Sequence, residues 1–294
     1  MKKLRVFTKE NKLFAILSIA LVFIILSAVF APLLAPYDPD TADMGNAFQS
    51  PDEDHWFGTD KLGRDVFSRV LFGTRVSLAA SLVLVSSIFV IGTTLGVIAG
   101  YFGGKIDTVI MRLSDMMISF PGMVLAIAVA GILGASVINA IIAIMIVSWT
   151  KYARLARSLV LKIRHKDFVY AAEVTGTKTS RILLRHMIPN VIPTLVITAT
   201  TDIGTMILEL AGLSFLGFGA QPPTPEWGLM LNEGRAYMLS CPWLMIFPGL
   251  AICLVVIVFN LLGDSLRDIL DPKFENQRRR ALSMQKTKKV NVGS

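Results

Sequence analysis

The sequence contains only two cysteines and three histidines among 294 residues. On one helix, the spacing of Cys241 and Cys253 would separate them by about 18 Å, which is too far for a disulfide. His55, His165 and His186 are scattered along the chain, and no His-Glu-x-x-His, Gly-x-Ser-x-Gly or Cys-x-x-Cys motif occurs. We therefore expect no catalytic residues, no metal site and no cofactor, and hence a protein that is not an enzyme.

Charge is also scarce. Charged residues make up 17% of the chain, hydrophobic residues 53%, and the mean hydropathy is +0.62. Soluble domains typically carry about 25% charged residues. The uncharged residues gather in six runs, at 13–34, 76–100, 118–133, 137–149, 191–216 and 244–262. Because a membrane-spanning helix needs about 20 apolar residues, these runs predict an all-α membrane protein with six transmembrane helices.

The first, third and fourth runs differ from an ordinary membrane span in position or length. The first follows a basic N-terminus, as a signal peptide does, but at about 22 residues it exceeds the apolar core of a signal and is expected to remain as a helix. The third and fourth runs are short and are separated only by residues 134–136. We expect them to form a tight helical hairpin whose ends extend into polar flanks.

The net charge of +8 is a topology signal. Outside the runs, 24 of the 29 Lys and Arg residues lie in the segments 1–12, 101–117, 150–190 and 263–294, and five lie in 35–75 and 219–243. The positive-inside rule then places both termini and the segment 150–190 in the cytoplasm. The basic residues are thus expected to contact membrane lipid, with no role in binding nucleic acid.

This topology divides the chain into four parts. They are an N-terminal stretch with the first helix (1–35), an extracytoplasmic loop (36–75), a five-helix core (76–264) that includes the cytoplasmic segment 150–190, and a basic cytoplasmic tail (265–294). The loop is either a solvated connector or a docking or gating surface, and Val66–Phe72 is expected to be a short interfacial helix.

The second apolar run carries a stripe of glycines. Gly92, Gly96 and Gly100 recur every four residues, which favours close packing of two helices. The nearby segment 100–106 is not a phosphate-binding loop, because residue 99 is Ala and residue 106 is Ile. If ATP drives this protein, it must therefore bind to another chain.

Asp202 and Glu209 are the two charged residues inside an apolar run. Seven residues separate them, so they lie on one helix face, about 10 Å apart along the axis. A carboxylate facing lipid costs several kcal/mol, and we expect both to face the bundle interior. They either line a translocation path for a cationic or amine-bearing solute or form structural contacts with neighbouring helices.

The segment 150–190 carries the most information. Apolar residues recur at helical spacing on either side of Gly176, which is suited to a helix C-cap, and Pro189 marks the start of the fifth span. The pattern predicts a cytoplasmic helix-turn-helix, and a loop this long with its own structure is usually functional.

This segment resembles the EAA loop of ABC importer permeases, Glu-Ala-Ala-x3-Gly-x9-Ile-x-Leu-Pro. Ala171, Ala172, Gly176 and Pro189 match that pattern, whereas Tyr170 stands in place of the Glu. His186 takes the first Ile position and Ile188 the Leu position. The resemblance implies that the loop, including Glu173, seats a short helix in a groove of an ATPase subunit.

The resemblance extends over nearly the whole chain. Similar stretches are Phe57-Gly58-Thr59-Asp60, Leu62-Gly63-Arg64-Asp65, Ser214-Phe215-Leu216-Gly217, residues 221–228 and residues 259–272. Together they resemble the second, C-type permease of dipeptide, oligopeptide and nickel importers. That family implies the type I permease fold in the bacterial cytoplasmic membrane. It also implies a homologous second permease, two cytoplasmic ATPases and an extracytoplasmic substrate-binding protein as partners.

The sequence favours nickel or another metal, carried as a chelate, as the transported solute, with di- or oligopeptides as the alternative. Asp202-Ile203-Gly204 looks somewhat more like nickel-type members, and an acidic path suits a cation, although zwitterionic peptides suit it too. A secondary transporter is the other class to consider. It would require coupling-ion sites and usually inverted repeats, which the sequence lacks.

Overall fold

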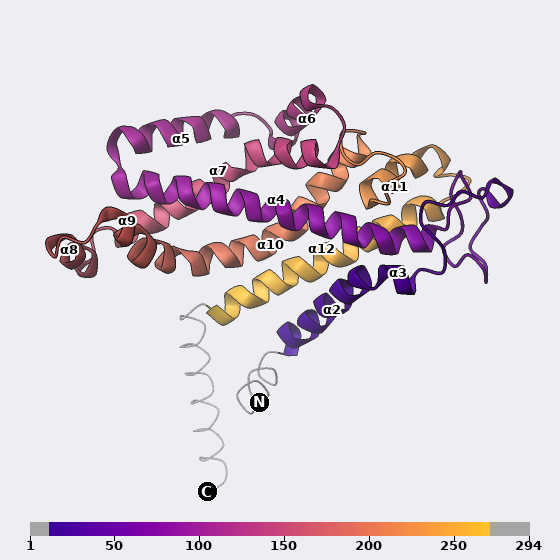
Figure 1. Cartoon of the computed structure of the whole chain (residues 1–294), viewed down its shortest axis with the longest axis horizontal. Helices are drawn as coiled ribbons and strands as arrows, with labels where there is room; N and C mark the ends of the chain where they lie inside the picture. Colours follow the sequence, from indigo (N-terminus) through magenta and orange to yellow (C-terminus); the bar gives the residue numbers. More distant parts are fainter. Residues whose placement is uncertain (1–11, 271–294) are drawn as a thin grey trace, which may run out of the picture.

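The computed structural model describes residues 12–270, and the chain is helical over most of that range (Figure 1). Five helices, the fourth counted with its preceding turns, are long and apolar enough to cross a membrane. They are α2 (Lys12–Val29), α4 (Val66–Phe102), α7 (Val137–Ile163), α10 (Ile188–Phe215) and α12 (Trp243–Leu270). Shorter helices are α3 (Ala31–Leu34), α5 (Gly104–Ile118), α6 (Gly122–Leu133), α8 (Asp167–Val174), α9 (Thr179–Ile182) and α11 (Trp227–Gly234).

The all-α architecture predicted from the sequence is confirmed. No β-strand forms between residues 12 and 270, and the five long helices together with the bent pair α5–α6 supply up to six spans. The residues before Lys12 and most of the predicted basic tail lie outside the described range. Cys241 lies before α12 and Cys253 within it, so they do not share one helix as assumed above, and both are free.

The third span is a bent pair of helices. Helices α5 and α6 meet at a bend of 91°, so the apolar run 118–133 is interrupted before α6 begins at Gly122. Pro121 lies directly before α6, and a proline pushes the preceding residue away from helical geometry. Alone, α6 is only about 18 Å long, too short to cross a membrane. The predicted hairpin between α6 and α7 does form, and the Ser136 hydroxyl accepts a hydrogen bond from the backbone N–H of Ile138.

The second span is longer than predicted. Val66–Phe72 is not a separate interfacial helix but the first two turns of α4, which continues to Phe102. Asp65 caps this helix, since its Oδ2 accepts a hydrogen bond of 2.7 Å from the backbone N–H of Ser68. The 37 residues of α4 measure about 55 Å, against a bilayer core of about 30 Å. The helix therefore reaches beyond the membrane.

The glycine stripe of α4 packs against α7, as predicted. A Cβ atom at Gly92 would lie 2.5 Å from the carbonyl oxygen of Trp149, and one at Gly96 would lie 2.3 Å from that of Ala153. Gly100 is similarly crowded by α7. Only a hydrogen at these positions lets the two backbones approach, so α4 and α7 form a tightly packed pair.

The fourth span extends into its polar flank, as predicted, with α7 running 14 residues past Trp149 to Ile163. Three basic residues on this extension, spaced three apart, each pair with an acid on a neighbouring helix. The pairs are Lys151–Asp202, Arg154–Asp115 and Arg157–Asp107. Each of these basic side chains thus has an acidic partner, and the helix continues through the segment in which they lie.

The segment predicted to couple to an ATPase and the loop before α4 lie at opposite ends of the molecule (Figure 1). Helices α8 and α9 lie at one end of the long axis, and residues 35–65 with α11 lie at the other. The start of α2 and the end of α12 both lie away from residues 35–65.

Candidate functional site

A cavity of about 340 Å³ opens between α7 and α10, beside the break that separates α5 from α6. Its polar wall comes from α7 and α10, and its apolar wall comes mainly from α4, α5 and the break. The lining residues are Ile88, Met117, Ile118, Phe120, Gly122, Val147, Ser148, Thr150, Lys151, Asp202, Thr205, Met206 and Glu209. The two carboxylates expected to share a helix face thus line the same cavity.

Asp202 has a partner that the sequence did not reveal. The Nζ atom of Lys151 donates a hydrogen bond of 2.6 Å to its Oδ1 atom. Asp202 is 3% exposed, whereas the side chain of Lys151 is 59% exposed and extends along the cavity. The ion pair offsets the cost of a carboxylate within the membrane, and the exposed ammonium keeps donors that are available to a solute.

Packing on the other side of α10 fixes Asp202 in this position. A Cβ atom at Gly204 would lie 3.0 Å from Oδ1 of Asn260, and one at Gly263 would lie 2.3 Å from Cγ2 of Thr201. Small residues therefore bring α10 and α12 together beside the cavity. In Asp202-Ile203-Gly204, the acid faces α7 and the glycine faces α12.

Helix α8 and the turn after it have the predicted form. Gly176 has a φ of +74°, and its N–H donates 3.0 Å to the carbonyl oxygen of Glu173. The N–H of Thr177 donates 3.0 Å to the carbonyl of Ala172. These two bonds form a Schellman cap, which ends the helix at a position where glycine is preferred. Pro189 lies in the first turn of α10, where a proline lacks no hydrogen bond.

Helix α8 presents two different faces. Val169 and Ala172 face the body of the protein and are buried in the core. Glu173 is exposed and lies next to them, with its carboxylate directed at the end of α4. Tyr170 and Val174 face outward, and Val174 is 88% exposed. The predicted coupling residues are thus brought together on one short helix and its cap, apart from Pro189, and an apolar face of this helix is left uncovered.

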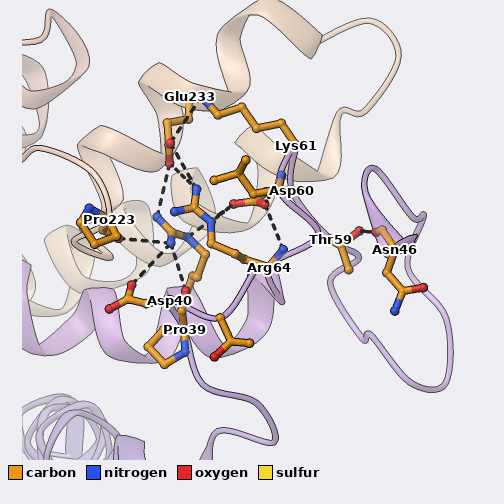
Figure 2. A network of polar contacts seen from close by, with 12 residues as sticks. Pro39, Asp40, Asn46, Thr59, Asp60, Lys61, Arg64, Pro223 and Glu233 are labelled. Atoms are coloured by element: carbon orange, nitrogen blue, oxygen red, sulfur yellow. Dashed lines mark hydrogen bonds and ion pairs between the residues drawn. The ribbon is translucent and has the colours of Figure 1, made fainter. Parts of the chain in front are cut away.

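The structure adds an ionic network at the opposite end, which sequence reasoning missed (Figure 2). Arg64 Nε donates 2.6 Å to Oδ2 of Asp60, and Arg64 Nη2 lies 3.1 Å from Oε2 of Glu233 on α11. Arg69 Nη2 donates to the same Glu233 oxygen at 3.3 Å. Both arginines are only 1% exposed, so this part of the loop is not a solvated connector.

The remainder of the outer loop also folds onto itself. His55 Nδ1 lies 2.9 Å from Oδ1 of Asp65, and both side chains are buried. The backbone N–H of His55 donates 2.6 Å to Asp52, and this bond lowers the pKa of the Asp52 carboxyl from its ordinary value. Among residues 12–270, no group of three or more His, Cys, Asp or Glu side chains is arranged to hold a metal ion.

Two family models match this chain. Residues 92–276 match the model described as "Binding-protein-dependent transport system inner membrane component", and residues 6–51 match "N-terminal TM domain of oligopeptide transport permease C". The first match covers more than half of the chain. The chain therefore belongs to the binding-protein-dependent transport system inner membrane component family: it is a membrane permease subunit of an ABC importer.

Its relatives include permeases for different solutes. It is 47% identical over 268 residues to the dipeptide transport system permease protein DppC of Alkalihalophilus pseudofirmus, covering 91% of this chain and 88% of the relative. It is 48% identical over 255 residues to the glutathione transport system permease protein GsiD of Escherichia coli O157:H7, covering 86% and 84%. It is 44% identical over 257 residues to the nickel transport system permease protein NikC of Escherichia coli K12, covering 86% and 93%.

Solved structures agree on the fold. The inward-facing MetNI methionine ABC transporter superimposes with a TM-score of 0.58 at 19% identity, over 70% of this chain and 98% of that chain. A second crystal form gives a TM-score of 0.56 at 20% identity, over 69% and 97%. The predicted type I permease fold is therefore confirmed.

Proposed function

We propose that this permease forms one half of the path for a small zwitterionic peptide, with a homologous second permease forming the other half. The observation that carries the proposal is the cavity that holds Lys151, Asp202 and Glu209 together. A zwitterion has a carboxylate that suits the exposed ammonium of Lys151 and an amine that suits Glu209. The relatives named for dipeptide and glutathione transport support a solute of this class.

Nickel, bare or chelated, is the second candidate, favoured by the 44% identity to NikC. The Lys151–Asp202 ion pair disfavours a bare nickel ion in this cavity. Because Lys151 neutralises Asp202, a bare cation would have to displace an ammonium that is held 2.6 Å away. A chelate with carboxylates of its own is compatible with the mixed charge of the wall.

The ATP-binding partners would contact the end of the protein that carries α8, which lies away from residues 35–65. We propose that α8 docks into a groove on one cytoplasmic ATPase and that a second ATPase binds the partner permease. The uncovered side chains of Tyr170 and Val174 support this, as does the Gly176 cap that fixes the shape of the helix. ATP binding and hydrolysis on those subunits would rock the permeases between outward- and inward-facing states.

This assignment orients the molecule in the bacterial cytoplasmic membrane. Helix α8 and both termini lie in the cytoplasm, and residues 35–65 with α11 face outward, where a substrate-binding protein delivers the solute. The support is the distribution of Lys and Arg, of which 24 of 29 fall in segments assigned to the inside.

Uptake by intact cells tests the proposed function. In cells that lack this chain, uptake of a labelled dipeptide and of labelled nickel should be measured in parallel, with the wild-type chain restored on a plasmid. We expect restoration of dipeptide uptake and no change in nickel uptake. Restoration of nickel uptake alone would assign the cavity to a metal or its chelate, and restoration of neither would contradict both candidates.

A further inference from the structure

The end of α4 is tied to α8 by a hydrogen bond between side chains. The hydroxyl of Tyr101 donates 3.1 Å to Oε1 of Glu173, across 72 positions of the chain. Tyr101 is in the last turn of α4, and Glu173 lies on α8 next to the residues that face the body of the protein. This bond therefore connects the segment that we assign to ATPase docking with a helix to which α8 has no covalent link nearby.

The bond is exposed to solvent, and Arg164 lies beside it. The guanidinium of Arg164 lies over the ring of Tyr101, with its Cζ atom 6.0 Å from the ring centroid. A Cβ atom at Gly103 would lie 3.1 Å from Nη1 of Arg164, and Gly103 has a φ of +65°. The turn between α4 and α5 is thus shaped around Arg164, which in turn supports the Tyr101 ring.

The covalent links of α8 lead to two helices of different mechanical character. Residues 164–166 join it to α7, which packs tightly against α4 along the glycine stripe. On its other side it reaches α10 through α9 and Leu183–Met187, a π-helical turn. Single π turns often occur at functional sites and interrupt the regular helix. A displacement of α8 is therefore transmitted to the tightly packed α4–α7 pair, whereas transmission to α10 must cross the irregular π-helical turn.

We propose that Tyr101 is a positioning residue for energy coupling: its bond to Glu173 makes α8 move as one body with the α4–α7 pair. The proposal rests on the proposed function, in which an ATPase docks on α8. Without the bond, α8 moves relative to the end of α4. Part of the displacement that the ATPase imposes on α8 then does not reach the α4–α7 pair. The bond thus sets how many solute molecules move per ATP hydrolysed.

The ratio of solute transported to ATP hydrolysed tests this, measured with the complete importer in proteoliposomes. Tyr101→Phe removes the hydroxyl and keeps the ring beneath Arg164. We expect the ratio to fall about twofold or more, the factor that corresponds to a hydrogen bond at the weak end of the usual range, while ATPase binding and the ATPase rate stay near wild type. Tyr237→Phe, the same chemical change at the opposite end of the protein, serves as the control and is expected to leave the ratio unchanged.

Substitutions of Glu173, the acceptor of this hydrogen bond, form the second part of the experiment. Glu173→Ala removes the acceptor and should lower the ratio as Tyr101→Phe does, whereas Glu173→Gln keeps an acceptor oxygen and should restore most of it. An unchanged ratio in both Tyr101→Phe and Glu173→Ala, with a working wild-type importer, would overturn this inference and leave the proposed function standing. A wild-type complex that neither binds ATPases nor transports would instead overturn the proposed function.

Discussion

Lys151 of α7 and Asp202 of α10 form an ion pair of 2.6 Å in the wall of the cavity. The two partners differ in environment, since Asp202 is 3% exposed and the side chain of Lys151 is 59% exposed. Removing Lys151 leaves a buried carboxylate without compensation, whereas removing the charge of Asp202 leaves an ammonium that water in the cavity can solvate. The pair therefore has an asymmetric effect on stability.

Lys151→Met is expected to destabilise the protein more than Asp202→Asn. The cost of an unpaired buried charge is about 3–5 kcal/mol at full burial, and the double variant should recover most of the loss because no charge is left unpaired. Thermal unfolding of the purified complex measures this. Equal stability of Lys151→Met and wild type would show that the pair contributes nothing, and peptide uptake should fall in all three variants.

Gly176 is expected to tolerate Asn and reject Val. Its φ of +74° strains any residue with a Cβ atom, and nothing lies within 4 Å, so the conformation and not the space is limiting. Asn adopts this region at low cost and β-branched Val does not. Gly176→Val should abolish uptake and leave membrane insertion intact, with Gly176→Asn retaining most activity. Normal uptake by the Val variant would refute the role of the cap.

Gly96→Leu is expected to disrupt the α4–α7 pair, because a Cβ atom there already lies 2.3 Å from the carbonyl oxygen of Ala153. The matched control is Gly249→Ala on α12, where nothing lies within 4 Å. That control should be neutral or gain up to about 1 kcal/mol from helix propensity. The yield of folded protein after size-exclusion chromatography distinguishes the two, and a normal yield for Gly96→Leu would contradict the packing.

Glu233→Ala is expected to release the outer loop. It removes one of the two carboxylates that Arg64 and Arg69, each 1% exposed, both contact, and leaves Asp60 as their remaining shared partner. Breaking a buried pair costs up to about 3–5 kcal/mol when the charge is left uncompensated. Lys61→Ala is the control, since Lys61 contacts the same Glu233 at 3.6 Å from an exposed position, where an ion pair contributes at most about 1 kcal/mol. Limited proteolysis of residues 35–65 should accelerate only in the first variant.

Much of the fold follows from local patterns in the sequence. The apolar runs locate the long helices, the four-residue glycine spacing indicates the α4–α7 contact, and Gly176 marks the end of α8. Each of these depends on residues close together in the chain. The shared face of Asp202 and Glu209 follows from helical geometry in the same way.

What the sequence did not show depends on distant contacts. Lys151 was counted as one of the basic residues of a cytoplasmic segment, yet it pairs with Asp202, 51 positions away. The Arg64–Glu233 contact spans 169 positions. Pro121 indicates from the sequence that the third span begins or kinks there, but the angle of 91° between α5 and α6 depends on packing that no local pattern shows.

The central claim is that the cavity beside Lys151 is part of the solute path, and cysteine labelling during turnover tests it most directly. The experiment uses a chain in which Cys241 and Cys253 are replaced by Ser. In that chain, Thr205→Cys would place a thiol on the cavity wall. As a control, Leu250→Cys would place a thiol on the exposed apolar face of α12. We predict that a membrane-impermeant thiol reagent labels the Thr205 position during ATP-driven transport, that saturating peptide slows this labelling, and that the Leu250 position is not labelled. Absence of labelling at position 205 in an importer that transports peptide would contradict the claim.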